Sequence, residues 1–136
     1  MVSAREAHEK AASGDSVIGW KLGREQRDAL LARFPPTYAE VVADHVTLRS
    51  GVACESALPG ENGGEIVGRS DDGEGVEAMV VRIGGTTDRP DGSTYHITWS
   101  LRDGRHARES NAVIARHGWR AIDPPIVVAL HPAVVG

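Results

Sequence analysis

The 136-residue chain has one cysteine, no long apolar run and no excess of positive charge. A single cysteine, Cys54, excludes an internal disulfide and favours a reducing compartment. The longest apolar stretches, 126–130 and 132–135, are too short to cross a bilayer. The first ten residues contain no apolar segment, so no signal peptide is expected. These absences predict a cytoplasmic protein that does not bind membranes.

The charge balance argues against a broad nucleic-acid surface. Lys and Arg number 15 against 19 Asp and Glu, a net charge of −4, whereas duplex DNA binding needs clustered cations. A small nucleotide or a strand end is still compatible with this balance. The Gly-rich segments 60–64 and 84–87 lack the Lys-Ser/Thr pair of a P-loop and are typical of turns. We expect no cofactor and no metal site, because no cluster of carboxylates or cysteines accompanies the histidines.

The patterning predicts one domain at 15–136, preceded by a flexible tail at 1–14. Strands are predicted at 17–22, 45–48, 65–70, 76–83, 94–101 and 126–130, and helices at 25–34 and 109–117. This β-α-β-β-β-β-α-β order is typical of an α+β domain with mostly antiparallel pairing.

Two short segments, Asp-His-Val-Thr-Leu at 44–48 and Tyr-His-Ile-Thr-Trp at 95–99, repeat one pattern. The core of that pattern, H-x-T, is expected only about 0.3 times by chance in this composition. Alternate side chains of a strand point to opposite faces, so His45 shares a face with Thr47, and His96 shares one with Thr98. The opposite face is predicted to carry Asp44, Val46, Leu48, Tyr95, Ile97, Trp99 and Leu101. Two such strands side by side would bring two imidazoles and two hydroxyls into one cleft.

This set of groups suits the cleavage of a phosphodiester. An imidazole can act as base or acid at neutral pH, so His45 and His96 are the candidate catalytic residues. The hydroxyls of Thr47 and Thr98 are candidate donors to the phosphoryl oxygens. Further candidate substrate contacts on or near the same faces are Arg49, Ser100 and Arg102. The scheme requires no metal ion.

Two H-x-T motifs with apolar flanks resemble those of the two-histidine (2H) phosphoesterase superfamily. That group includes 2′,3′-cyclic nucleotide phosphodiesterases and bacterial proteins labelled 2′-5′ RNA ligases. The segment 33–36 and the helix start at 109–111 are also similar to small members, and the resemblance covers about 16–131. It implies an α+β fold of two related lobes, mostly antiparallel strands with flanking helices, and an active-site cleft between the lobes. The chain is shorter than most members, which leaves substrate choice open.

The sequence therefore predicts a monomeric, metal-independent cyclic phosphodiesterase. Its substrate would be a small nucleotide or RNA end that carries a 2′,3′-cyclic or 2′,5′-linked phosphodiester, and the resemblance implies a 2′-phosphate product. An alternative is a non-catalytic module that binds a nucleotide or RNA end in the same cleft. A third is RNA joining, the reverse reaction. The sequence does not assign which histidine is the base.

Overall fold

The computed structural model describes residues 16–52 and 59–135, so the predicted tail at 1–14 and Cys54 lie outside the described residues. The strands are β1 (Ser16–Leu22), β2 (Glu40–Val41), β3 (His45–Val52), β4 (Gly63–Asp71), β5 (Val76–Arg82), β6 (His96–Leu101) and β7 (Arg120–Val135). The helices are α2 (Arg24–Arg33), the single-turn 3-10 helix η1 (Ala107–Glu109) and α3 (Ser110–His117). The predicted order of strands and helices is confirmed, with β2 and η1 as unpredicted additions.

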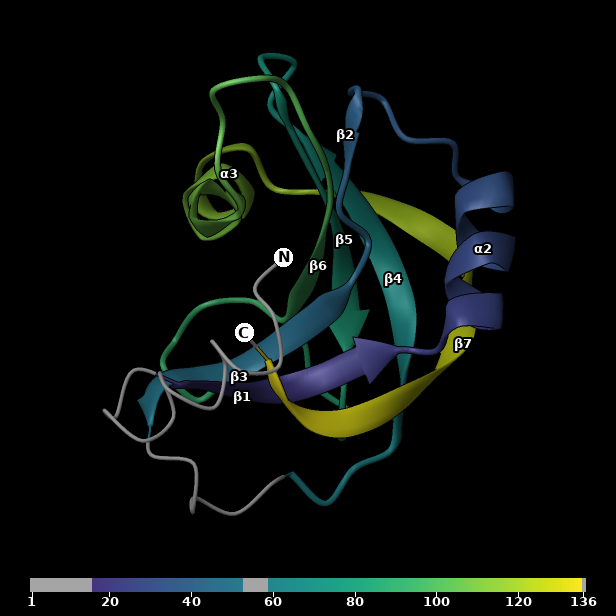
Figure 1. Ribbon diagram of the computed structural model, residues 1–136, viewed down its shortest axis with the longest axis vertical. Helices are drawn as coiled ribbons and strands as arrows, with labels where there is room; N and C mark the ends of the chain where they lie inside the picture. Colours follow the sequence, from purple (N-terminus) through teal and green to yellow (C-terminus); the bar gives the residue numbers. More distant parts are fainter. Residues whose placement is uncertain (1–15, 53–58, 136) are drawn as a thin grey trace.

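The sheet closes on itself. Its strands follow the order β2-β6-β3-β1-β7-β4-β5, and β5 also pairs with β6, so six strands form a closed antiparallel barrel to which β2 is added (Figure 1). The prediction of an α+β fold of two lobes with flanking helices and a cleft between them is therefore wrong, because the fold is a small antiparallel β-barrel. The two motif strands are neighbours in one sheet, joined where Val46 pairs with Ile97. Separate lobes are precluded because β7 pairs with both β1 and β4 and so links the first and second halves of the chain.

The long last strand shows why closure was not predicted. The sequence predicts a strand only at 126–130, after Pro124 and Pro125. In the structure these prolines lie where the β4–β7 register shifts, between the pairs Gly68–Ala121 and Ile66–Ile126. A bulged segment needs no regular ladder of N–H donors, so it accommodates proline. β7 can therefore continue through the prolines to both neighbouring strands.

The interior of the barrel holds the main core. Strand alternation directs one side chain in two inward, and the apolar partners of the motif histidines, Val46, Ile97 and Trp99, are fully buried there, as predicted. The remaining core residues are Trp20, Leu30, Ala43, Ile66, Met79, Val81, Ile83, Tyr95, Val128 and Leu130. The faces of β3 and β6 that carry the histidines are consequently directed outward.

A glycine allows β1 to pack tightly along the first motif strand. A Cβ atom on Gly19 would lie 2.0 Å from the carbonyl oxygen of Val46. Any side chain here would push β1 away from β3 at the residue between His45 and Thr47. The close approach also coincides with a register shift between Ile18 and Gly19. Gly19 thus fixes the backbone on which the first motif is displayed.

The two α-helices lie on opposite sides of the barrel (Figure 1). Leu30 of α2 packs on the main core, and the indole N–H of Trp99 donates to the carbonyl of Phe34, at 2.9 Å. Ile114 of α3 packs on the outer face of β5, which explains why β5 is buried on both faces. No helix in 16–52 or 59–135 is long and apolar enough to cross a membrane.

Candidate active site

The four residues of the H-x-T pattern lie on neighbouring strands. Continuing the antiparallel register from the Val46–Ile97 pair sets His45 opposite Thr98 and Thr47 opposite His96. Diagonal neighbours in such a pair are about 7–8 Å apart at their Cα atoms. The two imidazoles therefore project from adjacent positions on one outward face.

These four residues line one hollow of about 270 Å³. Its lining residues are Val17, His45, Thr47, Arg89, His96, Thr98, Ala107, Arg108 and Asn111. They come from β1, β3 and β6, from the loop before β6, and from η1 and the start of α3. The structure thus brings together the residues that the pattern singled out, although in a hollow on a barrel wall rather than between two lobes.

His45 is held by the residue that precedes it. Its Nδ1 lies 3.1 Å from Oδ2 of Asp44, and a carboxylate can only accept, so Nδ1 carries the proton. The free nitrogen of this ring is then Nε2. The bond from His45 lowers the pKa of Asp44 below its ordinary value, although burial opposes the shift. Asp44 can also pair with the ring as an ion if His45 becomes protonated.

Asp44 was expected to face away from the cleft, and its contact with His45 was missed. The expectation extended strand alternation to Asp44, but β3 begins only at His45. The preceding residue, Ala43, has a φ of +42°, which turns the backbone just before the strand. Alternation therefore does not determine where the carboxylate of Asp44 points.

His96 is oriented in the same manner by the backbone. Its Nδ1 lies 2.9 Å from the carbonyl oxygen of Thr94, so this nitrogen is the donor and Nε2 is again free. Burial lowers the pKa of His96 below its ordinary value, and the positive charge of Arg89 lowers it further, against the effect of the Thr94 bond. We conclude that His96 is neutral at pH 7, with an unprotonated Nε2.

This arrangement predicts the titration of His96. Its pKa should fall below 6.5, and substitution Arg89→Gln should raise it by removing a nearby positive charge. Because the unfolded chain binds this proton more tightly, His96 contributes stability above pH 6.5 that is lost as the pH falls through the folded pKa. NMR of the imidazole nitrogens across a pH series measures both the pKa and the tautomer. A neutral ring protonated at Nε2, or a pKa above 6.5 in the unsubstituted protein, would contradict the assignment.

The two threonines are not equivalent. Thr47 is half-buried, and its hydroxyl has no hydrogen-bond partner in the described part of the chain. Thr98 is buried, and its Oγ1 lies 2.8 Å from Oγ of Ser110 and 3.4 Å from the carbonyl oxygen of Ala107. Thr47 is therefore the hydroxyl available to a ligand, whereas Thr98 connects β6 to the start of α3.

The three further candidate contacts do not reach this hollow. Ser100 is fully buried, and its hydroxyl donates to Glu77 at 2.7 Å. Arg49 and Arg102 are exposed and are not among the residues that line the hollow. Beyond Thr98 the β5–β6 register shifts: Ala78 pairs with Thr98 but Glu77 pairs with Ser100, so Ser100 lies on the Glu77 face of the sheet and not on the face of Thr98. The two-residue alternation therefore does not extend from Thr98 to Ser100.

Three further polar residues line the hollow and were not predicted from the sequence: Arg89, Arg108 and Asn111. Arg89 lies in a turn-rich loop, and the other two belong to η1 and the start of α3. No spacing relative to the H-x-T motifs marks them. Their positions depend on how the loop before β6 and the start of α3 fold over the barrel wall. Arg89 and Arg108 give this site two cations in a chain of net negative charge.

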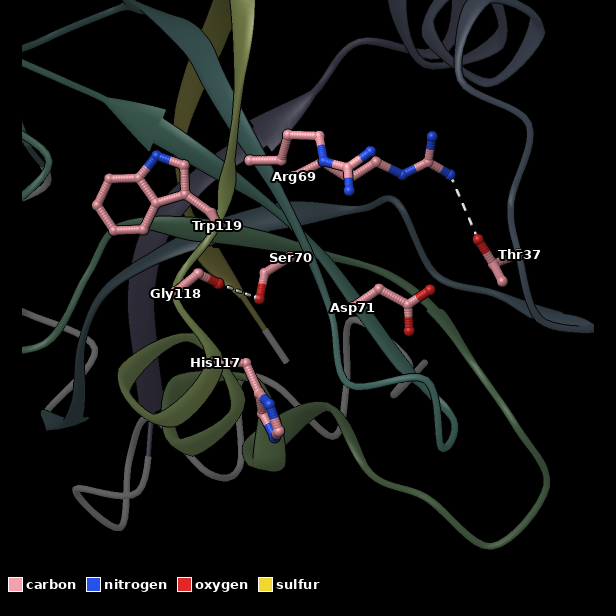
Figure 2. Close-up of a pocket in the computed structure, with 8 residues that line it drawn as sticks. Thr37, Arg69, Ser70, Asp71, His117, Gly118 and Trp119 are labelled. Carbon is pink, nitrogen blue, oxygen red and sulfur yellow. Dashed lines mark hydrogen bonds between the residues drawn. The ribbon is translucent and has the colours of Figure 1, made fainter.

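Two larger hollows lie elsewhere on the surface. One, of about 520 Å³, shares His45 and Ala107 with the histidine hollow, so His45 stands at their junction. The other, of about 740 Å³, contains neither motif histidine. Figure 2 shows this second hollow. Arg69 donates to Thr37 on one side of it, and Trp119 lies on the opposite side. Of the three hollows, only the smallest is lined by both motif histidines.

Comparison with protein-family models, curated proteins and solved structures finds no match to this chain.

Proposed function

We propose that this protein is a metal-independent phosphodiesterase that acts on a 2′,3′-cyclic or 2′,5′-linked phosphodiester of a nucleotide or RNA end. The observation that supports this most is the pair of imidazoles in one hollow. Each ring has its Nδ1 bonded to a fixed acceptor, Asp44 for His45 and the Thr94 carbonyl for His96. Each therefore keeps Nε2 for proton transfer, which is the requirement for paired acid and base catalysis.

The surroundings of the two rings suggest their roles. His96, buried and neutral, is suited to be the base that removes a proton from the attacking water. His45, beside the Asp44 carboxylate, is suited to hold the proton that the leaving oxygen receives. His45 also borders the larger neighbouring hollow, where a leaving nucleoside has room.

The reaction follows from these roles. Nε2 of His96 takes a proton from water as the water oxygen bonds to phosphorus. The bond from phosphorus to a ribose oxygen breaks, and Nε2–H of His45 protonates that oxygen. The products are a phosphate monoester and a ribose hydroxyl, and the two rings return to their starting states by exchanging a proton with solvent. Thr47 would donate to a non-bridging oxygen as negative charge develops on it.

Removing the hydroxyl of Thr47 tests the last step. We expect Thr47→Val to lose about 2–4 kcal/mol of transition-state stabilisation, the usual effect of deleting one donor to a developing oxyanion. Thr47→Ser, which keeps the hydroxyl, should retain most of the activity. The measurement is kcat/KM for the best substrate, with thermal unfolding to compare folding. Equal rates for Thr47→Val and the unsubstituted protein would assign Thr47 a packing role alone.

The proposal as a whole is tested by a substrate panel in the presence of EDTA. The panel contains 2′,3′-cyclic mononucleotides and 2′,5′- and 3′,5′-linked dinucleotides, with products separated by chromatography. A double variant, His45→Ala with His96→Ala, is purified in parallel to measure contaminating nuclease. We expect turnover of a cyclic or 2′,5′-linked compound by the unsubstituted protein only. Turnover equal to that of the double variant on every compound would overturn the proposal and leave a binding module.

A further inference from the structure

Two buried side-chain atoms in the described part of the chain have no hydrogen-bond partner: Nε of Arg89 and Oδ1 of Asn111. Both residues line the hollow that contains His45 and His96. Buried polar atoms of folded proteins are nearly always paired, because leaving one unpaired costs stability. That both exceptions meet in the same hollow indicates that a ligand supplies the missing partners.

The guanidinium of Arg89 is fixed in place. Its side chain is only 10% exposed, and Nη2 lies 2.5 Å from Oδ2 of Asp91. The loop around it is closed by bonds from Arg89 N to Ser93 O and from Gly92 N to Arg89 O, each 2.9 Å. Because Nη2 is bonded to Asp91, the Nε–H of this positively charged guanidinium remains as a fixed donor. Its natural partner is an anionic oxygen.

Asn111 supplies the opposite kind of group. It lies in the first turn of α3, next to Ser110, which bonds Thr98 in the floor of the hollow. Its carbonyl oxygen is an acceptor and needs a donor, such as a hydroxyl. An anion beside a hydroxyl would therefore supply the hydrogen-bond partners that Arg89 Nε–H and Asn111 Oδ1 lack.

We propose that Arg89 and Asn111 form a subsite for a ribose phosphate, in which Arg89 Nε–H binds a phosphoryl oxygen and the Asn111 carbonyl accepts from the adjacent sugar hydroxyl. This inference rests on the proposed function, because the phosphate is the one that the histidines act on. The hydroxyl is present in a 2′,5′-linked diester and forms when a cyclic diester opens. The hollow, of about 270 Å³, lies just below the usual range for small-ligand sites of about 300–1,000 Å³. That size suits one sugar phosphate rather than a long strand.

Equilibrium binding of a product tests the subsite without requiring turnover. The probes are adenosine 2′-monophosphate and its 3′-deoxy analogue, measured by calorimetry with EDTA present. We expect the unsubstituted protein to bind the compound with the 3′-hydroxyl at least about tenfold more tightly than the 3′-deoxy analogue. Without that hydroxyl, the Asn111 carbonyl oxygen would remain buried without a hydrogen-bond donor. Asn111→Leu should remove this preference, and Arg89→Gln should weaken the binding of both compounds. Arg116→Gln, an exposed charge on the same helix, is the matched control and should bind normally.

Stability measurements separate this role from a structural one. Asn111→Leu deletes an acceptor that is unpaired without ligand, so it should unfold at the same temperature as the unsubstituted protein or higher. If that variant does not fold, Asn111→Asp keeps the shape and should weaken phosphate binding by charge repulsion. Normal binding by the Asn111 and Arg89 variants would overturn the subsite, even if turnover is observed. Discrimination between the two probes in a protein that turns over no diester would support the subsite and overturn the proposed function.

Discussion

Replacing either His45 or His96 by alanine is expected to lower kcat at least about a hundredfold, the usual contribution of a positioned acid or base. Each ring supplies one proton transfer, and no other described titratable group lines the hollow except two arginines. The double variant should lose less than the product of the two single losses, because the rings act on one transition state. His117→Ala, at the exposed end of α3, is the control and should leave the rate unchanged.

The same pair predicts the pH dependence of the rate. One ring must be neutral and the other protonated, so kcat/KM should follow a bell-shaped profile near neutrality. The lowered pKa of His96 extends its neutral form to more acidic pH, which assigns the acidic limb to this residue. Arg89→Gln should move that limb to higher pH. Near-normal rates in both alanine variants, or loss of activity in EDTA with recovery on adding zinc, would show that the two-histidine mechanism is wrong.

The sequence predicted the parts of this site that depend on local periodicity. Alternation placed His45 with Thr47 and His96 with Thr98, and it placed Val46 and Ile97 in the core. It did not predict which strands pair, because pairing depends on closure of the whole sheet. The extent of β7 through its prolines decides that closure. Two lobes and one barrel are therefore compatible with the same strand order.

The rest of the site depends on groups that the sequence does not mark. Arg89 and Asn111 reach the hollow only because their loop and helix fold over β6. Ser100 would share a face with Thr98 in a regular strand, but the β5–β6 register shift turns it to Glu77, and its hydroxyl also accepts from the backbone N–H of Tyr38, at 3.1 Å. A two-residue period predicts the faces of a regular strand, whereas a register shift that interrupts the period depends on the pairing with the neighbouring strand.

Ser100 belongs to a buried cluster around Glu77 that holds the segment before β2 against β5 and β6. The carboxylate of Glu77 is fully buried, and it accepts from Thr37 N at 3.0 Å, Thr37 Oγ1 at 2.7 Å and Ser100 Oγ at 2.7 Å. Arg69 of β4 pairs with the same carboxylate and also donates to Thr37 (Figure 2). Burial alone would raise the pKa of Glu77, but these bonds outweigh it and lower the pKa below its ordinary value.

Substitution Glu77→Ala should destabilise the protein by about 3–5 kcal/mol, because it leaves the charge of Arg69 and two hydroxyls without their buried partner. Glu65→Ala breaks the half-exposed pair with Arg82, between the same two strands, and should cost only about 0–1 kcal/mol. Chemical denaturation at pH 7 measures both losses. Equal losses in the two variants would show that the Glu77 cluster contributes no more than a surface ion pair.

Lowering the pH should remove the stability that the ionised Glu77 carboxylate contributes. The unfolded carboxyl titrates near its ordinary pKa of 4.5, and the folded one titrates lower. The stability due to ionised Glu77 is therefore complete above pH 4.5 and is lost as the pH falls through the folded pKa. The unsubstituted protein should lose stability more steeply than Glu77→Gln over this interval, so the difference between them narrows in acid. A difference that stays constant from pH 7 to below the folded pKa would mean that packing around residue 77, and not its charge, holds β4, β5 and β6 to the segment before β2.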